Sequence, residues 1–456
     1  MTQELTRLGH IHFIGIGGIG MSGIAEILLD LGYKVSGSDL GDNPVITKLK
    51  AKGAIIYQGH AAYQIEGATI VVYSSAVKTT NPEFAEAVIK SIPIMKRAEM
   101  LAQLMKLKKG IAIAGSHGKT TTTSLVASIF DVAKKDATHI IGGIVSNLGG
   151  NARSGKGEYL IAEADESDGS FLLLNPEIVA ITNIDNDHLD HYGTKDKIEE
   201  AFIQFINQVP FFGKVILNFD DVTIQKLKSS FNRPSVWFSL HSLSENYCAQ
   251  NIAYSANGSE FDLFIDGQYS IRIMTPVWGE HNVSNSLASI ALAHQLGIEL
   301  SKIQAGLNSF KGVGRRLEKI YQDENLLIID DYAHHPTEIN ATLSSIRKVD
   351  DRKLIGVFEP HRYSRMSSFW NEFQASLSLL DEVYILPIYE ASEAPLEGIT
   401  SEAFTHEMNE NGKKTTFIEK DKVLELFQKN KQTSHIIVTL GAGSISKIAR
   451  EAVLKL

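Results

Sequence analysis

Cysteine is almost absent from this 456-residue chain, in which Cys248 stands alone. A single cysteine excludes an intramolecular disulfide and a cysteine-cluster metal site, a pattern typical of proteins in a reducing compartment. No apolar run reaches the roughly 18 residues that a membrane-spanning helix needs, and residues 1–7 lack the apolar core of a signal peptide. We therefore expect a cytoplasmic protein with no membrane span.

Positive charge is also in short supply, because 44 lysine and arginine residues stand against 53 aspartate and glutamate residues. The formal net charge of -9 argues against binding to nucleic acid or to an anionic membrane surface. A hydrophobic share of 43% with 21% charged residues is typical of globular proteins, and the length predicts two or three domains. We expect small-molecule partners and a monomer or homodimer.

Short runs rich in valine and isoleucine alternate with helical stretches, which is the pattern of parallel α/β domains. Expected strands lie at residues 11–16, 34–38, 111–114, 159–162, 178–182, 215–217, 326–329, 354–358, 383–386 and 436–440. Residues 250–274 favour a hairpin that turns at Asp266-Gly267. The sequence predicts an α/β fold in three domains, namely a Rossmann-like N-terminal domain (1–107), a central P-loop ATPase-type parallel-sheet domain (108–312) and a Rossmann-like C-terminal domain (313–456).

The most informative stretch follows the apolar run 111–114 and opens a helix. It consists of Gly115, Ser116, His117, Gly118, Lys119, Thr120 and Thr121. Glycine lets backbone N–H groups approach an anion, a helix N-terminus adds free donors, Lys119 neutralises phosphate charge, and Thr120 offers a hydroxyl to Mg2+. Ile113 stands where the general P-loop has another glycine, so we interpret the stretch as a compact variant of a nucleotide-phosphate loop.

A second glycine loop ends the first expected strand. Its glycines are Gly15, Gly17, Gly18 and Gly20, in a G-x-G-x-x-G pattern. Asp39 comes about 20 positions later, after the next expected strand, where a ribose hydroxyl would be bound. The loop suits a dinucleotide or the diphosphate of another nucleotide. Two nucleotide loops on one chain favour an ATP-consuming enzyme with a nucleotide-linked substrate, whereas a nicotinamide-dependent oxidoreductase would use only this loop.

Polar side chains follow expected strands at four further places. In open parallel sheets, ligands bind at the carboxyl ends of the strands. These ends hold Glu163 with Asp165, residues 185–188, residues 330–335 and residues 361–365. Histidine recurs in these clusters and in the phosphate loop, which favours a catalytic site over histidines scattered through a core.

Eight motifs resemble those of the Mur ligases, the ATP-dependent amide-forming enzymes of peptidoglycan precursor synthesis. In chain order they are GIGGIGMSGIAE (15–26), HGKT (117–120), EADESD (163–168), NIDNDH (183–188), HNVSN (281–285), GRR (314–316), DDYAHHPTE (330–338) and PHRYSR (360–365). Ser116 departs from the usual threonine of the family but keeps a hydroxyl. Ser444 stands where an acidic or amide residue commonly follows residues 441–443.

The resemblance implies that the enzyme joins L-alanine to the lactyl carboxylate of UDP-N-acetylmuramate through an acyl phosphate, releasing ADP and phosphate. It implies two divalent ions, Mg2+ or Mn2+, of which one is held by Thr120 and Glu163 and the second by His188 together with Glu163. It assigns ATP to the phosphate loop with Asn282, Asn285, Arg316 and Asp331, and the UDP-sugar to the first glycine loop with Asp39, His60 and Ser74. It assigns the amino acid to Tyr332, His334, Arg362 and Arg365, and catalysis to Lys119, Glu163, His188, His334 and His361.

Arg362 and Arg365 lie three positions apart and share a face if a helix begins there. Planar guanidinium groups suit the carboxylate of an amino acid. The sequence leaves open which histidine takes the proton of the incoming amine, and whether alanine is preferred over glycine or serine. A non-catalytic nucleotide switch would need no amino-acid site. The nearest rival within the family is a recycling ligase that attaches a whole tripeptide to the same UDP-sugar.

Overall fold

The computed structural model describes residues 9–74, 76–185, 189–391 and 393–456. The chain divides into two compact units. The first comprises Met1–Asn251, Phe261–Met274 and Ser284–Lys311, and the second comprises Ile252–Glu260, Thr275–Val283 and Gly312–Leu456. Within the described ranges, no helix is long and apolar enough to cross a membrane.

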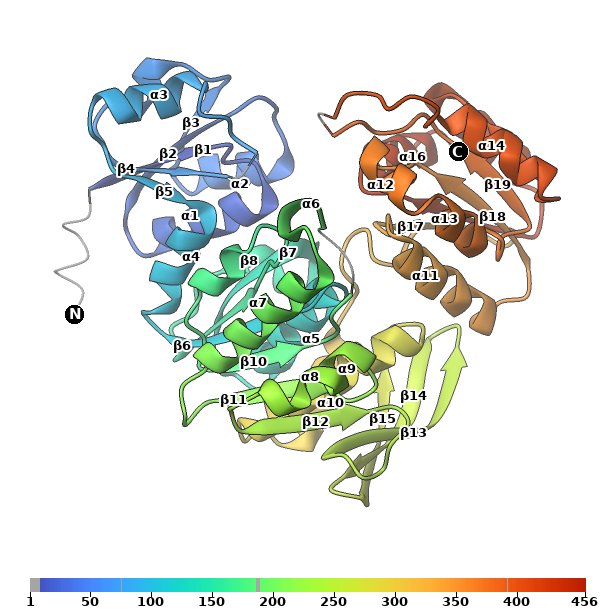
Figure 1. The fold of residues 1–456 in the computed structure, drawn as a ribbon, viewed down its shortest axis with the longest axis horizontal. Coiled ribbons are helices and arrows are strands. Elements are labelled where there is room, and N and C mark those ends of the chain that lie inside the picture. The colour runs from blue at the N-terminus through green and yellow to red at the C-terminus, as the bar shows by residue number, and fades with distance from the viewer. Residues whose placement is uncertain (1–8, 75, 186–188, 392) are drawn as a thin grey trace. The chain divides into compact units, whose positions relative to one another are not determined.

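A parallel sheet with the strand order β3-β2-β1-β4-β5 opens the first unit (Figure 1). Its strands are β1 (His10–Ile14), β2 (Lys34–Asp39), β3 (Ile55–Gln58), β4 (Ala68–Tyr73) and β5 (Ile94–Lys96). The helices of this part are α1 (Ile19–Asp30), α2 (Pro44–Ala51), α3 (Pro82–Ile89) and α4 (Arg97–Met105). The strand order reverses between β1 and β4, and ligands of open α/β sheets bind outside the carboxyl ends at such a point.

The central sheet has the strand order β15-β14-β13-β12-β11-β10-β6-β9-β7-β8. Its strands are β6 (Lys109–Ala114), β7 (Thr138–Val145), β8 (Gly150–Arg153), β9 (Tyr159–Glu163), β10 (Ile178–Ile181), β11 (Lys214–Asn218), β12 (Ser235–Ser239), β13 (Tyr247–Ser255), β14 (Gly258–Ile265) and β15 (Gln268–Thr275). The helices here are α5 (Lys119–Val132), α6 (Leu189–Tyr192), α7 (Lys195–Gln208), α8 (Val222–Leu227), α9 (Glu280–Gln295) and α10 (Leu300–Ser309).

Two features of the central sheet follow from the sequence. β6 pairs in parallel with both β10 and β9, so the segments after these strands lie at one edge of the sheet. The expected hairpin is confirmed, since β14 and β15 are neighbours joined by Asp266 and Gly267 with φ of 48° and 76°. Positive φ at both central residues is what a two-residue type I′ turn needs.

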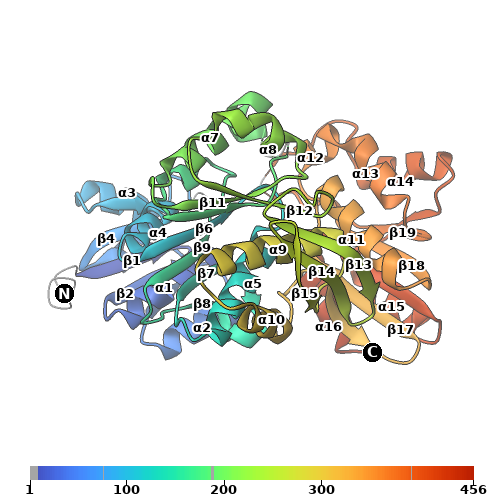
Figure 2. The same cartoon turned by 90° about the horizontal axis from the view of Figure 1, so that it is seen from below.

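Helix α1 fixes the first sheet to the central sheet within the first unit, and Figure 2 shows it beside β7 and β8. A Cβ atom on Gly23 would lie 3.2 Å from side-chain atoms of both Ala152 and Ile140. Asn151 Nδ2 donates to Ile19 O over 2.8 Å. A small residue on α1 therefore permits close packing, which holds the two glycine loops in one body.

The second unit contains a sheet with the order β16-β17-β21-β18-β19-β20, parallel except for β16. Its strands are β16 (Glu318–Gln322), β17 (Leu326–Asp331), β18 (Lys353–Phe358), β19 (Glu382–Ile385), β20 (Thr415–Phe417) and β21 (His435–Leu440). Its helices are α11 (Pro336–Val349), α12 (Tyr363–Ser368), α13 (Trp370–Leu377), α14 (Ser401–Glu410), α15 (Val423–Asn430) and α16 (Ile445–Val453).

Both faces of this last sheet are buried. Leu327 and Ile329 of β17 enter one hydrophobic core, and Leu326 and Ile328 enter another. Alternate side chains of a strand point to opposite faces, so helices must cover both sides. The three separate sheets confirm the predicted α/β class with three domains. The domain boundaries at 107/108 and 312/313 stay predictions.

Candidate active site

The predicted phosphate loop joins β6 to α5 and is shaped by two glycines with positive φ. Gly115 has φ of 131° and Gly118 has φ of 83°. A Cβ atom on Gly115 would lie 2.2 Å from Thr182 Oγ1, and one on Gly118 would lie 2.4 Å from Asn285 Oδ1. Only glycine fits these positions. The loop therefore lies directly against Asn285, which the sequence assigned to the same site.

Lys119 begins α5 and turns its ammonium group back over the loop. Its Nζ donates to Gly115 O over 2.7 Å, to Ser116 O over 3.2 Å and to Glu166 Oε1 over 2.8 Å. Burial favours the neutral amine, but the carboxylates of Glu166 and Asp165 outweigh it and hold the pKa of Lys119 above its usual value. Lys119 is therefore a fixed positive charge at the N-terminal end of α5.

Thr120 and Glu163, both predicted metal ligands, lie next to each other. Thr120 Oγ1 donates to Glu163 Oε2 over 3.1 Å, and Glu163 Oε1 accepts from Gly142 N–H over 2.5 Å. Glu163 ends β9, the neighbour of β6, and this register places its carboxylate beside the loop. Thr121 follows in the first turn of α5 and is buried. His188, the third predicted ligand, lies outside the described residues.

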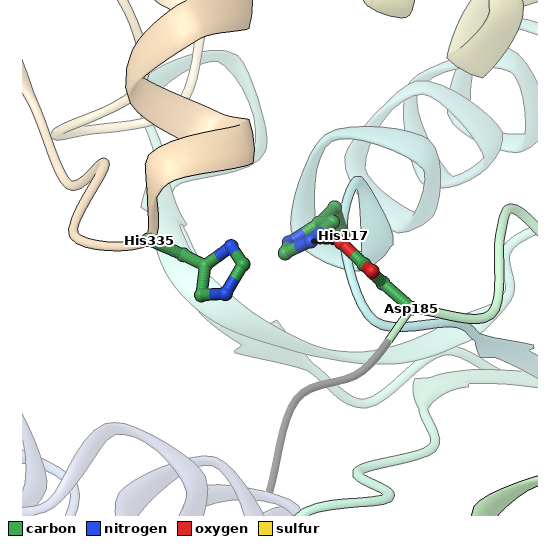
Figure 3. A group of neighbouring side chains, drawn as sticks. All are labelled: His117, Asp185 and His335. Carbon is green, nitrogen blue, oxygen red and sulfur yellow. Dashed lines mark hydrogen bonds and ion pairs between the residues drawn. The ribbon is translucent and has the colours of Figure 1, made fainter. Parts of the chain in front are cut away.

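The segment after β10 supports the loop from the other side. Asn183 Oδ1 accepts from His117 N–H over 2.8 Å, and Asp185 N–H donates to Ser116 Oγ over 2.8 Å. Figure 3 shows His117 beside Asp185, and Asp185 Oδ2 lies 3.1 Å from His117 Nε2. Ser116 thus uses the hydroxyl that it shares with threonine to hold this segment.

The first glycine loop is held by Asp39, the residue assigned to a ribose. Asp39 Oδ2 accepts from Gly17 N–H over 2.8 Å, and Oδ1 accepts from Gly41 N–H over 3.1 Å. Asn43 Nδ2 donates to Gly17 O over 3.2 Å. Gly18 is the N-cap of α1, so the loop leads into a helix N-terminus that favours anions. The structure brings these residues together and shows Asp39 shaping the loop itself.

Ser74 and His60, the other residues assigned to the UDP-sugar, lie at the same edge of the first sheet. A Cβ atom on Gly15 would lie 3.8 Å from Ser74 Oγ. His60 Nδ1 lies 3.0 Å from Ser38 Oγ and 3.2 Å from Glu83 Oε2. Glu83 was not expected here from the sequence.

Asp331 closes β17 in the second unit and binds the turns beside it. Its Oδ1 accepts from Ala333 N–H over 2.8 Å, and its Oδ2 accepts from Leu317 N–H over 2.7 Å. Burial raises the pKa of Asp331 to about 6, although the positive charge of Arg316 opposes the shift. Arg316 Cζ lies 5.1 Å from the centre of the Tyr332 ring. The end of β17 therefore gathers three predicted site residues.

His334 follows β17 and His361 follows β18, and the centres of their rings lie 5.8 Å apart. His334 Nδ1 lies 3.0 Å from Tyr332 O and 3.1 Å from Glu338 Oε2. Arg365 donates to His361 Nδ1 over 3.3 Å. Burial, helped by His334 and Arg365, lowers the pKa of His361 to about 3. His361 is therefore a neutral ring whose Nδ1 lone pair is already engaged.

A shared face of Arg362 and Arg365 was expected only if a helix began at these residues, and the structure does not meet this condition. Helix α12 begins at Tyr363, and Arg362 is its N-cap with φ of 70°. Arg362 NH1 lies 3.8 Å from Glu393 Oε1. Arg365 is in the helix, and its NH1 lies 3.3 Å from His361 Nδ1.

Two residues of the predicted motifs serve local structure in the second unit. Asn282 is buried and its Nδ2 donates to Trp278 O over 2.8 Å. His335, also drawn in Figure 3, is the N-cap of α11 and stands edge-on to Phe369 with ring centres 4.6 Å apart. The assigned nucleotide contacts of Asn282, Arg316 and Asp331 stay predictions.

Three family models match successive parts of the chain. They are Mur ligase family, catalytic domain, at residues 10–109, Mur ligase middle domain at residues 113–293, and Mur ligase, glutamate ligase domain, at residues 315–443. The chain belongs to the Mur ligase family. Enzymes of this family are ATP-dependent ligases, in agreement with the class that the sequence indicated.

Relatives of this Mur ligase match along nearly its whole length. A curated UDP-N-acetylmuramate--L-alanine ligase from Geobacter sp. (strain M21) is 43% identical over 453 residues, which cover 99% of this chain and 98% of the relative. The solved structure of UDP-N-acetylmuramate-alanine ligase MurC from Thermotoga maritima is 30% identical, with a TM-score of 0.84 and 98% of each chain covered. A murein peptide ligase from Psychrobacter arcticus 273-4 is 25% identical, with a TM-score of 0.74 and 98% of each chain covered.

This Mur ligase has further charged residues beside its loops that sequence reasoning missed. Arg97 opens α4 directly after β5, and a Cβ atom on Gly20 would lie 3.1 Å from Arg97 Cδ. Arg97 NH2 also lies 3.5 Å from Asp165 Oδ2. Glu166 forms the ion pair with Lys119. Arg97 follows a strand end, as the other site residues do. It was missed because its strand, β5, has only three residues and was not expected.

Proposed function

We propose that this Mur ligase joins L-alanine to the lactyl carboxylate of UDP-N-acetylmuramate, with ATP converted to ADP and phosphate. The cluster of Lys119, Thr120 and Glu163 around one glycine loop is the observation that carries the proposed chemistry. The choice of substrates is supported by the curated relative that bears this activity in its name and matches 99% of the chain.

The proposed reaction converts an unreactive carboxylate into an acylating agent. One carboxylate oxygen attacks the γ-phosphorus of ATP to give an acyl phosphate and ADP. The alanine amine then attacks the carbonyl carbon and expels phosphate, which keeps that oxygen. Both reactants of the first step are anions, and two unit charges roughly 4 Å apart repel by about 4 kcal/mol at an effective dielectric constant of about 20. A protonated Lys119 at the phosphate offsets a repulsion of this size.

We propose that Thr120 and Glu163 hold one Mg2+ or Mn2+ ion, and that His188 with Glu163 holds a second. The hydroxyl and carboxylate oxygens lie 3.1 Å apart at the N-terminal end of α5, and such oxygens are the ligands that hard divalent cations prefer. The ion would neutralise phosphate charge. Lys119 Nζ already donates to three acceptors, so a bound phosphate would replace at least one of these hydrogen bonds.

We propose that the first glycine loop binds the diphosphate of the UDP-sugar. Its backbone N–H groups and the N-terminus of α1 favour an anion there. The guanidinium of Arg97 packs against Gly20 of this loop and adds a cation. Asp165 lies 3.5 Å from Arg97 and would limit the directions in which that cation can turn.

We propose that Arg362 and Arg365 bind the amino-acid carboxylate and that His334 takes the proton of its amine. His361 suits this step poorly, because Arg365 occupies its Nδ1 and its pKa is lowered to about 3. His334 Nδ1 faces two acceptors, Tyr332 O and Glu338 Oε2, and so carries the hydrogen in the neutral ring. The Nε2 atom of His334 then carries the lone pair that a base needs.

Phosphate release from ATP tests the proposed function. We expect phosphate release only when UDP-N-acetylmuramate and L-alanine are both present. Glycine, L-serine and a cell-wall tripeptide are each tested in place of L-alanine in the same panel. Release with the tripeptide but not with free alanine would replace the proposal by the recycling ligase. NADH turnover without ATP would reject both. A cytoplasmic location and a monomeric or homodimeric state stay predictions.

A further inference from the structure

A buried polar network lies between α3 and the first sheet. Its centre is Glu83 in the first turn of α3, whose side chain is 0% exposed. Glu83 Oε2 accepts a hydrogen bond from Ser38 Oγ over 2.6 Å and lies 3.2 Å from His60 Nδ1. Glu83 Oε1 faces His12 Nε2 at 3.6 Å. The network reaches solvent at His60, whose side chain is 19% exposed.

The hydrogen positions around His60 follow from the donors that the network contains. Ser38 has one hydroxyl hydrogen, and Glu83 Oε2 accepts it. His60 Nδ1 then faces two acceptors, Ser38 Oγ at 3.0 Å and Glu83 Oε2 at 3.2 Å. A lone pair on Nδ1 would be repelled by both oxygens. Nδ1 therefore carries the hydrogen, and Nε2 of the neutral ring carries the lone pair.

Beyond Glu83, the network continues through His12 to Ser36 and His10. Ser36 Oγ lies 2.6 Å from His10 Nε2 and 2.7 Å from His12 Nδ1. Because one hydroxyl donates once, Ser36 accepts from one ring and donates to the other. The two placements of the Ser36 hydrogen put the hydrogen of a neutral His12 ring on either Nδ1 or Nε2. The 3.6 Å between His12 Nε2 and Glu83 Oε1 is too long for a hydrogen bond.

Packing alone does not explain a carboxylate at position 83. Other positions of α3 and the sheet are apolar, and Ala87, Ile14 and Val71 are buried in one cluster. A buried carboxylate costs free energy unless donors compensate it, and here the Ser38 hydroxyl is such a donor. The only exposed member of the Glu83 contacts described above is His60.

We propose that Glu83 is a positioning residue of the UDP-sugar site, which holds His60 with Nε2 directed as an acceptor toward a hydrogen-bond donor of the uridine. This inference rests on the proposed function, which assigns His60 to the UDP-sugar. The ribose hydroxyls and the uracil N3–H are donors, whereas the phosphate oxygens are acceptors. His60 would therefore recognise the nucleoside and leave the diphosphate to the first glycine loop.

Glu83→Gln tests the role of the carboxylate with little change of shape. Its amide nitrogen can donate to His60 Nδ1, which moves the ring hydrogen to Nε2 and removes the acceptor that the uridine needs. We expect the dissociation constant for UDP, measured by calorimetry, to rise about 10- to 100-fold. The KM values for ATP and L-alanine should stay unchanged. Glu86→Gln is the matched control, because Glu86 pairs with Lys90 on the same helix at 3.1 Å.

The tautomer of His60 is the second readout, and it is measured on the wild-type protein. In 15N NMR spectra of histidine-labelled wild-type protein, we expect His60 to be protonated at Nδ1, with its signals assigned by their absence from His60→Gln. Protonation at Nε2 would overturn the inference. A wild type that binds UDP, together with a Glu83→Gln variant that binds it equally well, would overturn the inference alone. A wild type that binds no UDP would overturn the proposed function as well.

Discussion

Replacing Lys119 by methionine removes a charge that serves both the stability of the fold and the proposed phosphoryl transfer. The ammonium group lies 2.8 Å from each oxygen of Glu166, whose side chain is 2% exposed, while that of Lys119 is 17% exposed. Removing one member of a buried ion pair costs about 3 to 5 kcal/mol, and the partial exposure of Lys119 favours the lower end, about 3 kcal/mol. Removing one preorganised group that stabilises developing charge lowers kcat by about 100- to 1000-fold.

The double variant Lys119→Met with Glu166→Gln distinguishes these effects. Without the buried carboxylate, we expect most of the lost unfolding free energy to return in urea titrations, while phosphate release stays as low as in the single variant. UDP binding by calorimetry should be nearly unchanged in both, because the first glycine loop is built by other residues. A single variant with kcat within tenfold of the wild type would refute the reasoning, as would a double variant that regains activity.

Three further perturbations address other parts of the account. Arg365→Ala should raise the KM for L-alanine roughly 10- to 150-fold, while the KM values for ATP and the UDP-sugar stay unchanged. Arg365→Lys should recover only part of the affinity for L-alanine, because lysine lacks the planar guanidinium fork. Weakened UDP-sugar binding instead would assign Arg365 to that ligand. Glu163→Ala should shift the dependence of activity on Mg2+ to higher concentration, and an unchanged metal titration would contradict the metal site. Burial lowers the pKa of His139 from 6.5 to about 4, so stability is lost as pH falls from 6.5 toward 4, by about 2 kcal/mol at pH 5. His139→Leu should remove this difference between unfolding free energies at pH 7 and pH 5.

The fold was predictable because buried parallel strands are short apolar runs between helices. The strands β1, β10 and β17 are buried at every position, and each was expected to within about two residues. The strands β5 and β20 have three residues each with mixed exposure, and they were not expected. Such short edge strands form because a neighbouring strand supplies their hydrogen bonds. The local sequence pattern does not predict this pairing.

The candidate site was predictable where strand ends decide the position. Thr120 and Glu163 meet because β6 and β9 are parallel neighbours. Glu83 could not be predicted, because an acidic residue in the first turn of a helix ordinarily stabilises the helix dipole at the surface, and the sequence does not show that it faces the sheet. The start of the helix after Arg362 was left open by the sequence, because its N-cap adopts a positive φ that is rare outside glycine.

Asp39 and Asp331 show a second limit of the sequence. Both follow buried strands and were assigned to ligands, and both accept backbone N–H bonds with their two oxygens. In each case one oxygen accepts from the turn that follows, at Gly41 or Ala333, and the other accepts from an earlier loop, at Gly17 or Leu317. Sequence alone does not separate this role from ligand binding, so their ligand contacts stay predictions.

Oxygen transfer tests the acyl phosphate most directly. UDP-N-acetylmuramate with 18O in its lactyl carboxylate is incubated with ATP, L-alanine and the enzyme, and the released phosphate is analysed by mass spectrometry. The account predicts one 18O atom in phosphate for each molecule of product, because the carboxylate oxygen that attacks phosphorus leaves with it. Unlabelled phosphate, or label found in AMP, would contradict transfer of the γ-phosphoryl group to the carboxylate.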